Sequence, residues 1–192
     1  MQRFDRTIED QYGIIEGNST VVFIKTGRGG SIFGAGDKYL RIAEQIKQKY
    51  GYSVVVSANP EGSVSNLEDE IREIIATGLD ISEIIFIGVS NGALVGAQQG
   101  WKSALISRML LINGPLMINW LKTKRGIEYF EGESIRIVYG EDDPSKQYFG
   151  LLDLIDSDRY EVCILPGVDH RFSGKEEVFV REILDFAEKR DE

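Results

Sequence analysis

Residues 84–97 read Ile84-Ile85-Phe86-Ile87-Gly88-Val89-Ser90-Asn91-Gly92-Ala93-Leu94-Val95-Gly96-Ala97. The first four are large and apolar, which predicts a strand buried on both faces, and the small and apolar residues after Gly92 predict a helix. The five residues between have the pattern Gly-x-Ser-x-Gly. Its glycines let the strand and the helix approach closely, so that Ser90 stands exposed where the helix begins. The alternative is an ordinary glycine-rich turn in which Ser90 caps the helix.

Apolar runs of the same kind repeat on both sides of this stretch. Buried strands are predicted at residues 21–24, 54–56, 109–112, 135–138 and 162–165. Apolar residues at helical spacing lie between them, at residues 39–50, 67–75 and 179–186. This alternation predicts an α/β fold, a three-layer α/β/α sandwich around a twisted, mostly parallel sheet of about seven or eight strands. The first residues, 7–16, are expected to add one or two antiparallel strands at the edge.

Two connections can be predicted in more detail. The helix at residues 67–75 is expected to begin with a capping box of Ser65 and Glu68 and to end before Gly78. Residues 113–134 separate two strands and leave room for one crossover helix, at residues 116–130. Because no independent lid fits there, residues 1–192 are expected to form a single domain without a separate lid domain.

Composition narrows the class of protein. The chain has 192 residues, with 22 Lys and Arg against 31 Asp and Glu, which gives a net charge of −9. A chain this acidic is repelled by phosphate backbones and anionic lipid, so neither nucleic acid nor a membrane is expected as a partner. The single cysteine cannot form an internal disulfide, and the polar N-terminus lacks the apolar core of a secretory signal. We therefore expect a cytoplasmic protein and leave its oligomeric state open.

The carboxyl ends of the predicted strands are the place to look for a binding site, because loops and helix N-termini converge there. A serine such as Ser90 is a weak nucleophile at neutral pH and needs a general base. The only histidine, His170, follows the strand at residues 162–165 and is expected at the same edge of the sheet. A lone histidine is more often a surface or core residue, but this position favours the role of base.

A carboxylate that orients the histidine should follow another strand. The strand at residues 135–138 runs into Glu141, Asp142 and Asp143, each of which is a candidate. The alternative is a solvated acidic turn that ends at an Asp-Pro pair. Asp169 is adjacent to the histidine in the chain and is therefore poorly placed to face its ring.

With these residues in order, the chain resembles the small α/β-hydrolases over nearly its whole length, residues 7–189. The serine, the acid and the histidine come in the order of that family, each after its own strand. The family's acid commonly stands three residues after a glycine that ends its strand, which selects Asp143, and its histidine often occurs as Gly-x-Asp-His, as in residues 167–170. The resemblance implies an acyl-transfer mechanism that uses Ser90, His170 and Asp143 as a catalytic triad.

Such a mechanism needs two backbone N–H groups that stabilise the negative oxygen of a tetrahedral intermediate. One is expected from Asn91, the residue after the nucleophile. The other is expected from residues 25–31, Lys-Thr-Gly-Arg-Gly-Gly-Ser, where Arg28 is the donor by position. The family often has His-Gly-x-Gly-Gly in this loop, and this chain carries Thr26 in place of the histidine. Lys25 and Arg28 could also contact an anionic substrate group, or simply be solvated.

Other classes of site fail on their spacing. A dinucleotide-binding fingerprint that starts at Gly27 has Ile32 where its third glycine belongs. The sequence Gly174-Lys175 is followed by Glu176 rather than by Ser or Thr, which excludes a P-loop. One histidine and one cysteine make no usual metal cluster, so neither a cofactor nor a metal is expected.

The expected function is hydrolysis of a small ester or thioester through an acyl-enzyme, with a small-molecule acyl compound as the substrate. Two alternatives stay open. The chain could be a non-catalytic binding protein that keeps the fold, or an acyltransferase or lyase on the same scaffold. A binding protein would turn over no activated ester, and removal of Ser90 would not change its behaviour.

Overall fold

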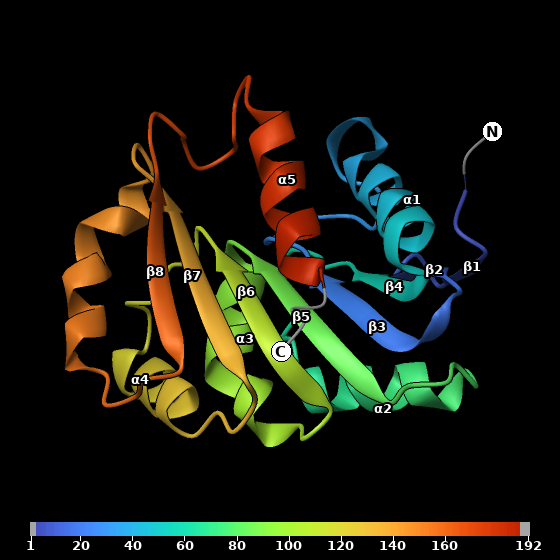
Figure 1. Cartoon of the computed structure of the whole chain (residues 1–192), viewed down its shortest axis with the longest axis horizontal. Helices are drawn as coiled ribbons and strands as arrows, with labels where there is room; N and C mark the ends of the chain where they lie inside the picture. Colours follow the sequence, from blue (N-terminus) through green and yellow to red (C-terminus); the bar gives the residue numbers. More distant parts are fainter. Residues whose placement is uncertain (1–2, 189–192) are drawn as a thin grey trace.

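Eight strands form one sheet in the computed structural model, which describes residues 3–188 (Figure 1). In chain order they are β1 (Arg6–Ile8), β2 (Tyr12–Ile15), β3 (Asn18–Lys25), β4 (Tyr52–Ser57), β5 (Glu83–Val89), β6 (Ile106–Ile112), β7 (Ser134–Gly140) and β8 (Tyr160–Leu165). Their order across the sheet is β1-β2-β4-β3-β5-β6-β7-β8. The strands from β3 to β8 are parallel, whereas β2 pairs antiparallel with both β4 and β1. The predicted parallel sheet and its antiparallel edge are confirmed.

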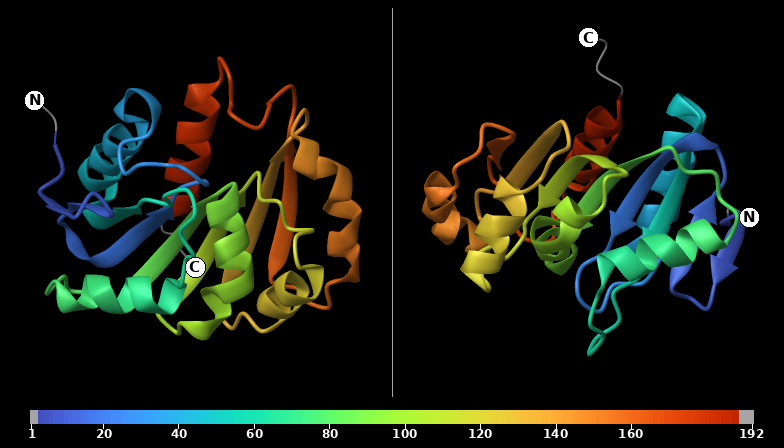
Figure 2. Two further views of the ribbon diagram at one scale, coloured as in Figure 1. Left: turned by 180° about the vertical axis from the view of Figure 1, so that it is seen from behind. Right: turned by 90° about the horizontal axis from the view of Figure 1, so that it is seen from below.

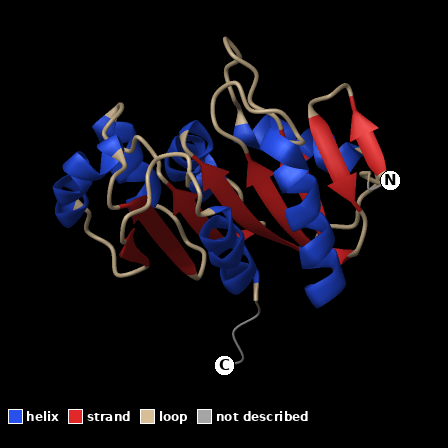
Figure 3. Cartoon of the chain, turned by 90° about the horizontal axis from the view of Figure 1, so that it is seen from above, coloured by secondary structure: helices blue, strands red, loops and turns tan. Residues whose placement is uncertain are grey.

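Helices cover both faces of this sheet. They are α1 (Lys38–Tyr50), α2 (Leu67–Ala76), α3 (Asn91–Gln99), α4 (Trp120–Glu128) and α5 (Glu176–Ala187), with 3₁₀ helices η1 (Ala35–Asp37), η2 (Gly100–Lys102) and η3 (Pro144–Leu154). The α1 and α5 helices lie on one face and α2, α3 and α4 on the other (Figures 1 and 2). Seen from above, the sheet runs between these two layers, as the predicted three-layer sandwich requires (Figure 3). Within residues 3–188, no helix is long and apolar enough to cross a membrane.

Alternation of side chains along the strands explains the two helix layers. In β3, Val22 and Ile24 belong to the buried cluster that includes α1 and α5, while Val21 and Phe23 belong to the cluster that includes α2, α3 and α4. All four side chains are buried. Because both faces of the central strands are covered, these strands contain continuous apolar runs instead of a strict alternation of apolar and polar residues.

The connection from β6 to β7 differs from its prediction. The helix expected at residues 116–130 is shorter, since α4 spans only Trp120–Glu128. The residue before it, Asn119, has a φ of 49°, a left-handed conformation that a right-handed helix does not contain. Residues 113–119 therefore form turns and irregular backbone rather than helix.

The start of α2 is also displaced by one residue from its prediction. Asn66, not Ser65, is the N-cap, and its side-chain oxygen accepts a hydrogen bond from the backbone N–H of Asp69. Ser65 instead offers its carbonyl oxygen to the side chain of Gln99. The predicted end of the helix is confirmed, because Gly78 follows it with a φ of 84°.

The order of the strands determines where the loops diverge. The chain runs from β3 through α1 to β4 on one side, then returns through α2 to β5 on the other side of β3. The loops after β3 and β5 therefore leave the sheet in opposite directions, and a crevice opens between their ends in folds of this kind. Ser90 follows β5, so it lies at this point of the sheet.

Candidate active site

Ser90 occupies a sharp turn between β5 and α3. Its backbone has φ 53° and ψ −117°, a conformation that is strained for a residue with a side chain. A Cβ on Gly88 would lie 2.5 Å from the carbonyl oxygen of Gly92, and one on Gly92 would lie 2.2 Å from the carbonyl oxygen of Lys25. A side chain at Gly88 would push β5 and α3 apart, and one at Gly92 would push α3 away from the end of β3, so both positions of the pentapeptide require glycine.

The hydroxyl of Ser90 does not cap α3. It lies 3.1 Å from Nε2 of His170, and Nδ1 of the same ring is hydrogen-bonded to Oδ2 of Asp143. Because a carboxylate only accepts hydrogen bonds, the ring proton belongs on Nδ1, which leaves Nε2 free to accept the proton of the serine. The structure thus brings the three predicted residues into one hydrogen-bonded series, and the simple capping role for Ser90 is wrong.

The environment of His170 favours a basic ring. Hydrogen bonding to Asp143 raises its pKa above the ordinary value of a histidine, an effect that partial burial opposes. The ring remains 41% exposed, whereas the Asp143 side chain is fully buried. The site therefore combines a buried carboxylate with a histidine that is exposed to solvent.

The other carboxylates near His170 are occupied elsewhere or exposed. Glu141 accepts a hydrogen bond from the backbone N–H of Gly167, and Asp142 is exposed. Asp169 accepts hydrogen bonds from two backbone N–H groups of its own loop, which lowers its pKa. Asp143 is the candidate that reaches the ring.

One residue that the sequence analysis did not predict holds together the loops that carry Asp143 and His170. Asn113, which follows β6 and is 1% exposed, donates from Nδ2 to the carbonyl oxygens of Asp169 and His170 at 3.3 and 3.2 Å. Its Oδ1 accepts from the backbone N–H of Gly140, at 2.8 Å. One buried amide therefore ties the histidine loop to the end of the strand that precedes the acid. Its place directly after a buried strand was the only signal in the sequence.

The loop after β3 lies against the nucleophile. A Cβ on Gly27 would be 3.2 Å from Cβ of Ser90, which makes Gly27 the point of closest approach. Among residues 3–188, the backbone N–H groups of Arg28 and Asn91 form no hydrogen bond. Neither predicted donor is thus engaged by another group of the described residues. Thr26, which replaces the histidine of the family pattern, is buried with its hydroxyl 3.2 Å from the carbonyl oxygen of Gly30.

Lys25 has neither of the two roles expected for it. Its side chain is 1% exposed and forms an ion pair with Glu70 of α2, with N–O distances of 2.9 and 3.0 Å. Its Nζ also donates to the hydroxyl of Ser57 and to the carbonyl oxygen of Ala58. Burial lowers the pKa of Lys25, which the Glu70 carboxylate opposes. Lys25 is therefore a structural cation beneath the loop, not a ligand for substrate.

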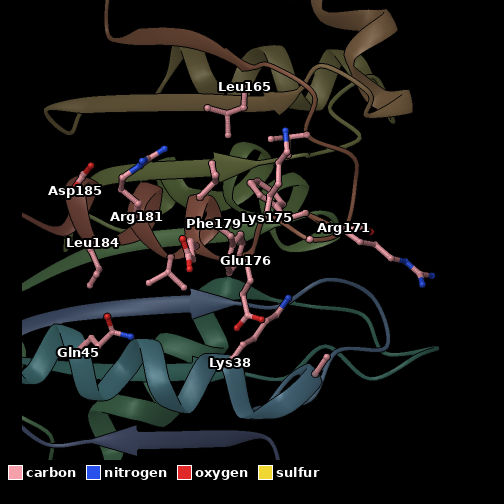
Figure 4. A pocket seen from close by; sticks show the side chains of 18 of the residues that line it. Lys38, Gln45, Leu165, Arg171, Lys175, Glu176, Phe179, Arg181, Leu184 and Asp185 are labelled. Carbon is pink, nitrogen blue, oxygen red and sulfur yellow. The ribbon is translucent and has the colours of Figure 1, made fainter.

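A large cavity lies beside this site rather than at it. It has a volume of about 1130 Å³ and runs between α1, α5 and the loop after β8. Figure 4 shows Lys38 and Glu176 pointing toward one another across it, with Arg171 directed outward. Neither Ser90 nor His170 lines this cavity. Within residues 3–188, no group of three or more His, Cys, Asp or Glu side chains is arranged to hold a metal ion.

Comparisons with known proteins find similarity in structure and almost none in sequence. No protein-family model matches the chain, and no curated protein matches it either. Est1E from Butyrivibrio proteoclasticus has 10% sequence identity and a TM-score of 0.70, over 91% of each chain. An α/β serine hydrolase homologue from Coxiella burnetii has 16% identity and a TM-score of 0.67, over 91% of this chain and 89% of the other. A structure described with the metagenome-derived lipolytic enzymes LipS and LipT has 13% identity and a TM-score of 0.68, over 97% and 99%.

These similarities extend over nearly the full length of both chains, although the sequences have diverged almost completely. The eight-stranded, mostly parallel sheet with helices on both faces is the arrangement that these structures share with the chain. The protein has the α/β-hydrolase fold.

Proposed function

We propose that this protein is a serine esterase that hydrolyses a small ester or thioester through an acyl-enzyme. The observation that carries the proposal is the hydrogen-bonded series from Ser90 through His170 to the buried Asp143. An ordinary surface serine has neither the strained turn nor the basic partner. The esterases and lipolytic enzymes among the similar structures support ester hydrolysis over other reactions on this fold.

In the acylation half-reaction, Oγ of Ser90 attacks the acyl carbon while Nε2 of His170 accepts its proton. Asp143 stabilises the imidazolium that forms and holds the ring in the correct tautomer. The carbonyl oxygen becomes an oxyanion, which accepts hydrogen bonds from the N–H groups of Arg28 and Asn91. The imidazolium then gives its proton to the leaving oxygen or sulfur as the bond to the acyl carbon breaks.

Deacylation repeats these steps with water. His170 takes a proton from a water molecule, whose oxygen attacks the acyl carbon of the Ser90 ester. The second tetrahedral intermediate uses the same two N–H donors. Its collapse releases the acid and returns the proton to Oγ of Ser90, which regenerates the enzyme.

A fluorophosphonate probe tests the proposal directly, because it reacts with activated serines and remains attached. Peptide mapping should find one label, on Ser90, and hydrolysis of p-nitrophenyl acetate should be lost in parallel. The Ser90→Ala variant should take up no label, and His170→Ala should be labelled at least tenfold more slowly because the base is missing.

Ser82 provides a matched control at the opposite end of β5. It is an exposed serine roughly 26 Å away along the strand, and its hydroxyl contacts only Ser19. The Ser82→Ala variant should label and hydrolyse as the unmodified protein does. Labelling of other serines, or turnover that survives Ser90→Ala, would contradict the proposal and favour a binding protein.

A further inference from the structure

One buried side chain, that of Asn59, lies where the loops after β3 and β4 meet the start of α3. We propose that Asn59 is a positioning residue that sets the spacing of the two oxyanion donors, the N–H groups of Arg28 and Asn91. The inference rests on the proposed esterase function and adds to it a residue that never touches the substrate. Asn59 follows β4, a strand that bears none of the three residues in the hydrogen-bonded series.

The side-chain amide of Asn59 joins the two segments that carry the donors. Its Nδ2 donates to the carbonyl oxygen of Thr26 at 3.1 Å, in the loop that leads to Arg28. The same nitrogen donates to Oδ1 of Asn91 at 2.9 Å, on the residue that provides the second donor. Because one nitrogen holds both partners, a shift of either segment stretches a hydrogen bond.

The backbone of Asn59 reinforces this connection on the loop side. Its carbonyl oxygen accepts from the N–H of Gly29 at 2.7 Å, and its own N–H donates to the carbonyl oxygen of Gly30 at 2.9 Å. These two bonds form an antiparallel bridge that survives any side-chain substitution. The loop is therefore anchored to the end of β4 by backbone hydrogen bonds, whereas the amide group provides its hydrogen-bonded link to α3.

The chemistry of the contacts requires an amide here. Both partners of Nδ2 are acceptor oxygens, a main-chain carbonyl and the side-chain carbonyl of Asn91, so the group between them must be a donor. The other side of the amide, Oδ1, lies 3.5 Å from the hydroxyl of Ser65. An aspartate would have the same shape but would turn a carboxylate oxygen toward two acceptors.

Burial increases the energetic cost of losing these hydrogen bonds. Asn59 is 3% exposed, so water does not replace a lost bond easily, and an unsatisfied buried acceptor is costly. Beneath it, the ion pair of Lys25 and Glu70 fixes the carbonyl of the preceding Ala58. The end of β4 is thus rigid, and Asn59 transmits that rigidity to both donors.

The test compares Asn59→Ala with the unmodified protein on an ester and on the matching thionoester, in which sulfur replaces the carbonyl oxygen. Sulfur accepts hydrogen bonds weakly, so the ratio of the two rates reports how well the N–H donors act on the oxyanion. We expect kcat for the ester to fall by about 10 to 100-fold, the ester to thionoester ratio to fall at least fivefold, and KM to change less than threefold. The pH midpoint of activity should not move, because His170 and Asp143 are untouched.

Gln98→Ala is the matched control. Gln98 is also a buried amide whose nitrogen donates to one carbonyl and one side-chain oxygen, Ile118 O at 2.9 Å and Thr123 Oγ at 3.1 Å. It lies about 10 Å further along α3 than Asn91. This variant should lose comparable thermal stability while the ester to thionoester ratio stays unchanged. If Asn59→Ala does not fold, Asn91→Ala removes one of the two bonds from a half-buried position and should lower the ratio at least twofold.

Two results would overturn the inference alone. One is an active Asn59→Ala enzyme with an unchanged ratio, and the other is a loss of kcat that Gln98→Ala reproduces with the same ratio. An absence of any Ser90-dependent turnover in the unmodified protein would instead overturn the proposed function, and the inference with it.

Discussion

The two sides of the candidate site are built in different ways. On the acid–base side, formed by the loops after β7 and β8, Asn113 bonds only to backbone groups, two carbonyls and the N–H of Gly140. On the oxyanion side, formed by the loops after β3 and β4 and the start of α3, Asn59 bonds to one carbonyl and to the side chain of Asn91. Both asparagines are buried, and each follows a strand that bears no residue of the hydrogen-bonded series.

In the proposed mechanism, this difference separates two kinds of control over one reaction. The acid–base side would determine when His170 can accept a proton, which the pH dependence of activity measures. The oxyanion side would determine how strongly developing charge is stabilised, which the response to a change of the carbonyl atom measures. Variants on the two sides should therefore leave different kinetic signatures, even where they lower turnover by the same factor.

The largest effect is expected from the acid. Asp143→Asn should lower kcat by about 10³ to 10⁴-fold, because the neutral amide neither selects the correct histidine tautomer nor stabilises the imidazolium. Asp142→Asn is the matched control, since its side chain is exposed and adjacent in sequence. It should cost less than about tenfold. Steady-state rates on p-nitrophenyl butyrate give both numbers, and a reversed order would show that Asp142 is the acid.

The same pair of variants has a pH signature. A neutral ring is needed as base, so activity should rise with pH through one midpoint above about 6.5, the ordinary pKa of histidine. The hydrogen bond to Asp143 is the first cause of the raised pKa of His170, so Asp143→Asn should move the midpoint of the residual activity to lower pH. Asp142→Asn should leave it in place. A profile that is flat from pH 5 to 9, with chemistry rate-limiting, would argue against His170 as base.

An intermediate effect is expected from Asn113. Its φ is 49°, so Asn113→Gly removes the side chain without adding backbone strain. The buried N–H of Gly140 and the carbonyl of His170 then lose a partner, which should lower the free energy of unfolding by about 1–3 kcal/mol. Displacement of the ring relative to Ser90 should lower kcat/KM by up to about 10²-fold. Urea titration and steady-state kinetics measure the two quantities.

Asn113→Gly also tests the division of the site into two sides. It should alter the pH midpoint while the ester to thionoester ratio stays near that of the unmodified protein, the opposite of the pattern expected for Asn59→Ala. If Asn113→Gly and Asn59→Ala each changed both the pH midpoint and the ester to thionoester ratio, the two sides would act as one coupled unit. The proposed division of the site would then be wrong.

The strands and the three residues of the hydrogen-bonded series could be predicted from the sequence, whereas the residues that support them could not. Strands such as β5 could be predicted because burial on both faces selects continuous apolar runs in the sequence. Ser90, Asp143 and His170 were readable because chemistry restricts each role to few residue types, and the chain has one histidine. The resemblance to a known family then selected Asp143 from three adjacent acids.

The supporting residues could not be predicted from the sequence, and the reason is physical. The side chains of Asn59 and Asn113 act through hydrogen bonds to residues 27 to 57 positions away, and an asparagine in a loop has many local uses that give the same signal. Lys25 was misjudged because its partner, Glu70, lies 45 positions along the chain. The late start of the helix expected at residues 116–130 depended on the left-handed Asn119, which no periodicity shows.

The smallest effect concerns the acyl chain, and it tests whether the space between the two sides is open. The His170 ring is 41% exposed, and the cavity between α1 and α5 does not include Ser90 or His170. A chain bound in an enclosed tunnel gains about 0.8 kcal/mol for each buried methylene, so four more carbons would raise kcat/KM by about two orders of magnitude. In an open cleft most of the added chain stays in water and gains only a fraction of this.

We therefore expect kcat/KM for p-nitrophenyl acetate and butyrate to be at least equal to that for the decanoate, with differences of a few-fold across the series. The Ser90→Ala variant, measured at each chain length, provides the background that must be subtracted, since longer esters can also bind nonspecifically to apolar surface. A steep rise from four to twelve carbons that disappears in Ser90→Ala would contradict the open cleft. It would mean that residues 113–119 or η3 cover the site in solution, so that the two sides enclose an acyl pocket between them.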